Sequence, residues 1–257
     1  MFNHPNFIAL SSIVHKEISR YTRIWVQTLL PSSITMTLYF VIFGNLIGSR
    51  IGQMGGYSYM EFIVPGLIMM SVITNSYSNV VSSFFSTKFQ RSIEEIMVAP
   101  VPNVVILMGY VAGGVSRGMI TGLIVTLVSL FFVDIEISNP LLVIMVVVLT
   151  SIMFSLAGFV NAVFAKSFDD ISIVPTFILT PLTYLGGVFY SISLLPEFWQ
   201  KVSMGNPILY MVNAFRYGFL GTSDINIWVA VALILFFILS LASVAMFLLS
   251  RGIGLRS

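Results

Sequence analysis

The densest group of charged side chains in this chain lies in residues 88–95 and comprises Lys88, Arg91, Glu94 and Glu95. Two cations followed by two adjacent carboxylates can form ion pairs with a surface of complementary charge. The group contains no nucleophile with a base beside it, which covalent catalysis would need. The chemistry expected here is therefore a polar contact, with lipid headgroups or with a partner, and not catalysis.

The segment around these charges is also amphipathic. Thr87 and Gln90 have the spacing of a capping box, so we expect a helix to begin there, and Pro100 and Pro102 should end it. Such a helix either lies in the lipid headgroups or docks a soluble partner, and the pattern alone favours neither. Apolar residues recur at intervals of three and four along it, at Phe85, Phe89, Ile93, Ile96 and Met97.

Residues suited to catalysis or metal binding are sparse elsewhere. The chain has no cysteine, and both of its histidines, His4 and His15, precede the first long apolar run. None of its lysines follows a glycine, so a phosphate-binding G-K-[ST] loop is absent. The adjacent Asp169 and Asp170 would point in different directions on a helix, so we expect them to cap one. We expect no enzyme, no metal site and no cofactor bound to this chain.

Long apolar runs dominate the sequence, in which 57% of residues are hydrophobic and 9% are charged. This composition is typical of an integral membrane protein, where about 20 apolar residues cross the bilayer as a helix. No stretch alternates apolar and polar residues as barrel strands do, so the predicted fold class is all-α. Six membrane helices are expected, over residues 24–47, 62–81, 109–133, 137–165, 171–190 and 225–250.

The distribution of basic residues predicts the orientation. Most of them lie at one set of span ends, whereas Arg50, Lys201 and Arg216 lie at the other. By the positive-inside rule, both termini and the loop over 82–110 face the cytoplasm. The first apolar run is too long for a cleavable signal peptide, so we expect it to remain as a membrane anchor.

Residues 1–23 are expected to form an amphipathic helix along the inner membrane surface. One side of that helix carries the polar residues Lys16 and Arg20. The simpler alternative is a basic anchor that only precedes the first span. The apolar stripe on the other side consists of Phe7, Leu10, Val14, Ile18, Tyr21 and Trp25.

Polar and small residues within the spans predict helix contacts. Asn75, Asn79 and Asn161 either line a pathway or bond to a neighbouring helix, and for Asn75 and Asn79 we favour the second. Arg117 can reach the headgroups or pair with Asp169 or Asp170. Glycines four residues apart predict close packing of the third span, and this glycine face and the first and fifth spans are candidate dimer surfaces. The glycines are Gly109, Gly113, Gly114, Gly118 and Gly122.

The stretch over 191–223 would be an external loop, yet it is rich in large apolar residues that do not suit water. Pro196 and Pro207 can each open a short helix. We therefore expect a re-entrant helical hairpin that dips into the outer leaflet. Pro175 and Pro181 predict that the fifth span, just before it, is bent or interrupted.

Two segments of the sequence resemble the permeases of the ABC-2 type transporter family. They are KFQRSIEEIMVAPVP, residues 88–102, and GGVFYSISLLPEFWQ followed by NPILYMVNAFRYG near the predicted hairpin. The resemblance covers nearly the whole chain. It implies a single transmembrane domain over 1–257 with a coupling helix in 84–101. That helix would dock a separate cytoplasmic ATPase through Phe89, Arg91, Glu94, Glu95 and Ile96.

The resemblance also implies an exporter of the bacterial inner membrane, built as a homodimer, with ATP and Mg²⁺ bound by the partner ATPase. Its substrate would be amphipathic, lipid-like or a glycan, and its contacts would include membrane lipids but no nucleic acid. The alternatives are an ATP-independent carrier and a scaffold that moves nothing. An outer gate would be shaped by Tyr190, Pro196, Asn206, Pro207 and Arg216.

Overall fold

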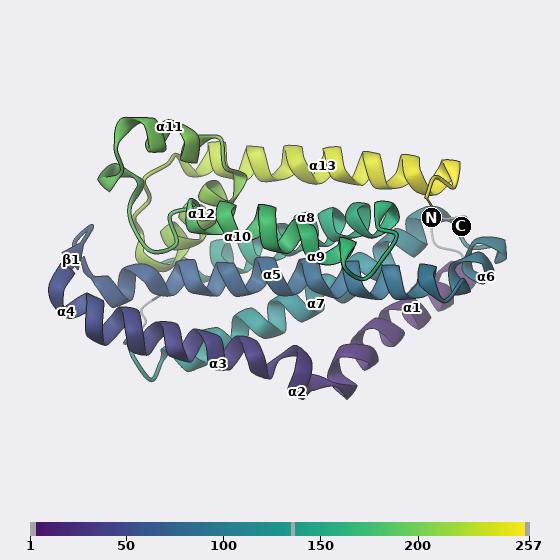
Figure 1. Cartoon of the computed structure of the whole chain (residues 1–257), viewed down its shortest axis with the longest axis horizontal. Coiled ribbons are helices and arrows are strands. Elements are labelled where there is room, and N and C mark those ends of the chain that lie inside the picture. Colours follow the sequence, from purple (N-terminus) through teal and green to yellow (C-terminus); the bar gives the residue numbers. More distant parts are fainter. Residues whose placement is uncertain (1–3, 135–136, 255–257) are drawn as a thin grey trace.

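The computed structural model describes residues 4–134 and 137–254, and most of them are helical (Figure 1). The first half comprises α1 (His4–Arg23), α2 (Trp25–Thr28), α3 (Leu30–Tyr39), the π-helix η1 (Phe40–Ile47), α4 (Gly48–Ile51), β1 (Gln53–Met54), β2 (Tyr57–Ser58), α5 (Tyr59–Phe89), α6 (Ser92–Val98) and α7 (Asn103–Ser129). The second comprises α8 (Pro140–Phe164), α9 (Asp170–Val174), the π-helix η2 (Pro175–Leu179), α10 (Thr180–Tyr184), the 3₁₀ helix η3 (Ile192–Leu194), α11 (Glu197–Met204), α12 (Pro207–Leu220) and α13 (Ile227–Arg251).

Helix α5 forms the centre of the bundle and packs against α7, α8 and α12. Its first turn is fixed by a capping box, in which the Ser58 hydroxyl accepts from the Glu61 amide and the Glu61 carboxylate accepts from the Ser58 amide. Its 31 residues span about 46 Å at about 1.5 Å each, which exceeds a hydrocarbon core of about 30 Å. The ends of α5 therefore extend beyond the apolar layer.

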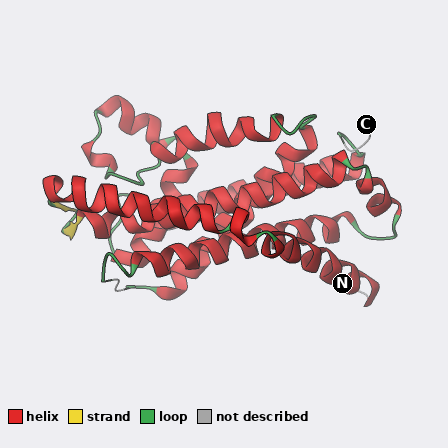
Figure 2. Ribbon diagram, turned by 60° about the horizontal axis from the view of Figure 1, so that its bottom comes forward, coloured by secondary structure: helices red, strands yellow, loops and turns green. Residues whose placement is uncertain are grey.

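The described strands form one short antiparallel hairpin at one end of the molecule, beside the start of α5 (Figure 2). Gln53 pairs with Ser58 and Met54 pairs with Tyr57. The turn between the strands consists of Gly55 and Gly56, whose φ angles of 62° and 88° suit glycine. The start of α1, helix α6 and the end of α13 lie together at the opposite end (Figure 1).

The polytopic all-α membrane fold is confirmed. Within the described residues, five helical segments are long and apolar enough to cross a bilayer: Trp25–Gly44, Tyr59–Phe89, Asn103–Ser129, Pro140–Phe164 and Ile227–Arg251. The predicted span over 171–190 is interrupted, as the prolines indicated. It divides into α9, η2 and α10, which end at Tyr184, and Pro175 begins the π-helical turn.

Two helices start where Pro196 and Pro207 predicted them. Pro196 precedes α11, and Asn206 caps α12 by accepting a hydrogen bond from the Ile208 amide with its side chain. Helix α12 is largely buried and packs against α5, α8 and α13. Helix α11 lies outside it, at the same end of the molecule as β1 (Figure 1).

The two-sided pattern predicted for the N-terminal helix is only partly present. Two residues of its polar side contact α5: Arg20 Nη2 donates to Asn79 Oδ1 over 2.8 Å, and Lys16 Nζ donates to Thr87 Oγ1 over 3.4 Å. These bonds form because α5 presents hydroxyl and amide groups on this side, and these groups bond charged side chains. The apolar stripe is divided: Tyr21 is buried, Leu10, Val14 and Ile18 are half-buried, and Phe7 and Trp25 are exposed.

The glycine face of α7 is not free to form a dimer contact. A Cβ at Gly109 would lie 2.5 Å from Ile13 of α1, and one at Gly118 would lie 2.0 Å from the Ser76 hydroxyl of α5. The predicted close packing is therefore present, but it occurs inside one chain. These glycines let α1, α5 and α8 pack closely against α7. Because residues of the same chain already cover them, they are not available for contact with a second copy.

Candidate functional site

The charged segment 88–95 forms a corner between two helices. Helix α5 continues to Phe89, the chain turns at Gln90 and Arg91, and α6 begins at Ser92. Arg91 adopts the left-handed conformation with a φ of 60°, the one described non-glycine residue with a positive φ. The segment is therefore two helices that meet at a sharp turn.

The helix start predicted at Thr87 is wrong. Thr87 lies inside α5, where its hydroxyl donates to the Ser83 carbonyl over 3.0 Å and accepts from the Tyr110 hydroxyl over 3.1 Å. Thr87 is buried, so its hydroxyl takes these partners instead of capping a free amide. Its carbonyl accepts from the Ser92 hydroxyl over 3.2 Å, which connects α6 to the last turn of α5.

Most of the predicted docking residues lie on the outside of this corner. Arg91, Glu94 and Glu95 are exposed, and none of them forms an ion pair within residues 4–134 and 137–254. Phe89 is 62% exposed, whereas Ile96 is half-buried. Ile93, which was not among the predicted docking residues, is buried and anchors α6 on the core. The corner thus presents charges and one large ring to the surroundings.

Lys88 holds the corner against the end of α8. Its ammonium donates to the carbonyls of Val163 over 2.6 Å and Ala165 over 2.8 Å, which are free acceptors at a helix C-terminus. A neighbouring cavity of about 570 Å³ is lined by Lys88, Phe89, Arg91 and others. The corner is therefore attached to α8 as well as to α5.

An aromatic cluster extends the corner across the loop after α8. The centre of the Phe168 ring lies 4.9 Å from the centre of the Phe85 ring and 5.2 Å from that of the Phe89 ring, and both pairs pack edge to face. Phe168 is itself exposed. We call Phe89, Arg91, Glu94, Glu95 and Phe168 together the α5–α6 corner.

The cap predicted from the two aspartates is not formed, because the N-cap residue Asp169 makes no side-chain capping bond; Asp170 is the first residue of α9. Its carboxylate accepts from the amides of Lys166 over 2.8 Å and Ser167 over 3.1 Å, and its own amide donates to the Ser167 hydroxyl. These backbone bonds, led by that of Lys166, hold the pKa of Asp170 below its ordinary value. Arg117 does not pair with an aspartate; it donates to the Thr28 carbonyl and to Asn75 Oδ1.

The three predicted asparagines each contact another helix. Asn75 also donates to the Ser32 hydroxyl of α3, Asn79 accepts from Arg20 of α1, and Asn161 donates to the Tyr77 hydroxyl of α5. These bonds agree with the interhelical interpretation of all three residues.

Glu17 is a functional candidate that the sequence prediction missed. It is buried between α1, α5 and α7, accepts from the Ser83 hydroxyl, and lies 3.6 Å from Arg20. Burial raises the pKa of Glu17 above its ordinary value. The spacing of Asn79, Ser83 and Thr87, four residues apart on α5, was the available signal of a polar stripe facing α1.

The predicted gate residues lie at the end of the molecule that contains the β-hairpin, and three of them bond to neighbouring segments there. Arg216 donates to the Gly187 carbonyl over 2.6 Å, and Asn206 donates to the Leu182 carbonyl. Tyr190 donates to the Tyr184 carbonyl over 2.9 Å. Asn206 thus holds α10, and Arg216 the segment after it, against α12, and a gating role for these residues stays a prediction.

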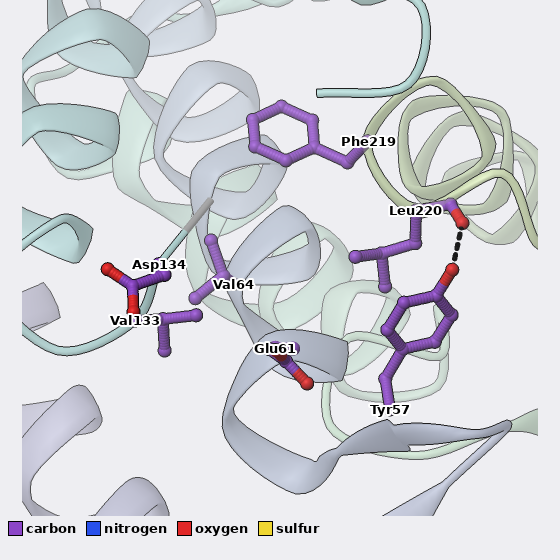
Figure 3. Close-up of a pocket in the computed structure, with 7 residues that line it drawn as sticks. All are labelled: Tyr57, Glu61, Val64, Val133, Asp134, Phe219 and Leu220. Atoms are coloured by element: carbon purple, nitrogen blue, oxygen red, sulfur yellow. Dashed lines mark hydrogen bonds between the residues drawn. The ribbon is translucent and has the colours of Figure 1, made fainter. Parts of the chain in front are cut away.

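Another cavity at this end contains two carboxylates (Figure 3). It has a volume of about 230 Å³, and Glu61 and Asp134 line it together with apolar side chains. The Tyr57 hydroxyl beside it donates to the Leu220 carbonyl, which joins the β-hairpin to α12. Within the residues that the structure describes, no three metal-binding side chains gather here or elsewhere.

The fold and the α5–α6 corner define a multi-span helical membrane protein with a charged, exposed helix turn at one end. Residues 8–220 match the ABC-2 type transporter family, and the chain belongs to that family. It is 61% identical over 254 residues to the inner membrane transport permease YadH of Escherichia coli strain K12, covering 99% of both chains. It is 23% identical over 191 residues to nodulation protein J of Rhizobium meliloti strain 1021, covering 74% of this chain and 73% of that one.

Proposed function

We propose that this chain is the permease subunit of an ABC-2 type exporter and that a separate cytoplasmic ATPase docks on the α5–α6 corner. The observation that carries the proposal is the exposure of Arg91, Glu94 and Glu95 without ion pairs in the described residues. Charges left unpaired on a firmly anchored turn suit a partner with complementary charge. The family and the name of the permease YadH support the transport role.

Movement of the docked ATPase would reach the spans through the contacts of the corner. Ser92 bonds to the Thr87 carbonyl, and the Thr87 hydroxyl in turn contacts Tyr110 of α7 and Lys16 of α1. Lys88 connects the same turn to α8. A displacement of α6 would therefore be transmitted to three helices, α1, α7 and α8.

The corner would face the cytoplasm, together with the start of α1 and the end of α13. These parts lie at one end of the molecule (Figure 1), and the exposed cations Arg91, Lys166 and Arg251 lie on or beside them. On this orientation α9, η2 and α10 begin the fifth of the six crossings from the inside. The hairpin of α11 and α12 would complete the apolar layer from the outside, as a re-entrant element.

Two copies of the permease would assemble about a two-fold axis, since one bundle alone encloses no pathway. With the glycine face used internally, the first span and the α9–α10 segment remain as contact surfaces. They expose Ile34, Leu38 and Phe177. A largely uncharged surface suits an amphipathic, lipid-like or glycan substrate better than a small ion.

The docking proposal is tested by reversing the charge of the corner. Glu94→Arg with Glu95→Arg should abolish the ATP turnover that the permease stimulates in its partner, because like charges would then meet across the contact. Glu197→Arg, a charge reversal on α11 at the other end, should leave that turnover unchanged. Normal membrane insertion with unchanged turnover in the double variant would reject the docking assignment.

A further inference from the structure

A cavity of about 490 Å³ lies between the β-hairpin, η3 and the loop after α12. Its lining combines one guanidinium, that of Arg216, with the carboxylate of Asp224 and the hydroxyls of Ser193, Thr222 and Ser223. This donor-rich lining lies at the end opposite to the α5–α6 corner (Figure 1). The cavity is separate from the docking surface in both position and chemistry.

Arg216 lines this cavity, and one donor of its guanidinium is unused. The side chain is 1% exposed, Nη2 donates to the Gly187 carbonyl, Nε donates to the Phe62 carbonyl over 3.4 Å, and the guanidinium lies 3.9 Å from the centre of the Phe62 ring. Within the described residues Nη1 is buried and has no hydrogen-bond partner. A buried guanidinium without a paired anion is costly, so an anion that reached Nη1 would form a strong charge-assisted bond.

Asp224 limits the charge of that anion. No ion pair joins it to Arg216 in the part of the chain that the structure describes. Its carboxylate is instead held by the Ser191 hydroxyl at 2.9 and 3.0 Å and by the Ile192 amide at 3.3 Å. A group with two negative charges would be repelled by this carboxylate, whereas a group with one would meet less repulsion.

We propose that the Arg216 cavity binds the phosphodiester group of an amphipathic molecule, with Nη1 of Arg216 donating to a phosphate oxygen. A phosphodiester carries a single negative charge and several acceptor oxygens, which suits one free guanidinium donor among hydroxyls. Binding at this site needs no ATP. The inference therefore goes beyond the proposed transport function and can fail independently of it.

The test is calorimetric titration of the purified protein, in a detergent with an uncharged headgroup, with glycerophosphoglycerol and with inorganic phosphate. We expect saturable binding of the phosphodiester and weaker binding of inorganic phosphate. Arg216→Gln should weaken binding by roughly tenfold to a hundredfold, the typical effect of losing a charged hydrogen bond. Lys201→Gln, which removes a cation from the same end but outside the cavity, should leave binding unchanged.

The same titrations contain the results that would overturn the site. They are no binding to the wild-type protein, equal binding to Arg216→Gln, or equal or tighter binding of inorganic phosphate. If thermal unfolding shows that Arg216→Gln does not fold, Asp224→Asn decides the question. Removing that carboxylate should tighten binding of both anions severalfold, and an unchanged affinity would overturn the proposal.

Discussion

Arg117 and Arg216 show how single residues carry charge inside this fold. Arg117 bonds to the Thr28 carbonyl and Asn75, and Arg216 bonds to two carbonyls and stacks on Phe62. Neither forms an ion pair within the described residues. Neutral acceptors at fixed positions therefore set the geometry of both side chains. Removing one of these acceptors should change the position of the guanidinium that it binds.

Glu17 gives a pH prediction at the residue scale. Because burial raises its pKa, the folded protein keeps the proton at pH values where the unfolded chain has lost it. Its contribution to stability is full below the unfolded value of about 4.3 and is lost as the pH rises through the folded pKa. Glu17→Gln should therefore flatten the fall in melting temperature above that pH, because the amide oxygen can still accept from Ser83.

The measurement is thermal unfolding of both proteins in detergent between pH 4 and pH 8. Glu197→Gln, an exposed carboxylate on α11, serves as the control and should keep the wild-type pH profile. A wild-type profile in Glu17→Gln would show that the Glu17 carboxyl does not titrate between these limits.

At the scale of elements, the backbones of α8 and α5 approach each other closely at Gly158. A Cβ at Gly158 would lie 2.6 Å from the Tyr77 carbonyl oxygen and 3.3 Å from the Val81 amide. Gly158→Ala should therefore separate the two helices and lower the free energy of unfolding by about 1–3 kcal/mol. Gly109→Ala meets only the Ile13 side chain of the peripheral helix α1 and should cost less.

Thermal or denaturant unfolding of the two alanine variants, side by side, measures this difference. A smaller loss for Gly158→Ala than for Gly109→Ala would mean that α5 and α8 adjust more easily than α1 does. That outcome would contradict the assignment of α5 and α8 as the rigid centre of the bundle.

Several elements could be predicted from the sequence because their signals are local. The apolar runs predicted the membrane helices, Pro196 and Pro207 predicted the starts of α11 and α12, and Pro175 predicted the interruption before α10. The charged group at residues 88–95 was also visible in the sequence, and Arg91, Glu94 and Glu95 are exposed; their docking role, which the family resemblance implied, stays a prediction. Each of these features depends on residues that are neighbours in the chain.

The errors concern residues whose partners are distant in the chain. Thr87 was predicted to be a cap because its partner Tyr110 belongs to another helix and gives no local signal. Arg20 was placed on the polar side of a surface helix because its partner Asn79 is 59 positions away in the sequence. The glycine face of α7 was a valid contact signal, but its pattern does not say whether the partner belongs to the same chain. Glu17 was missed for the same reason: only the packed structure buries it.

At the scale of the whole molecule, the absence of cysteine makes the topology directly testable. Single cysteines at Glu95, Lys166, Gln53 and Lys201 replace exposed side chains at the two ends. In intact cells an impermeant maleimide should label only Gln53→Cys and Lys201→Cys, and after permeabilisation it should label all four. Labelling of Lys166→Cys and Lys201→Cys from the same side would mean that the chain between them does not cross the membrane.

The most direct test of the central claim is purification of this protein from its native membranes in mild detergent, with identification of the chains that accompany it and assay of ATP hydrolysis. The account predicts a stoichiometric soluble ATPase that is lost from the Glu94→Arg, Glu95→Arg variant and retained by Glu197→Arg. Recovery of the permease without an ATPase in several detergents would contradict it and favour an ATP-independent carrier or a scaffold.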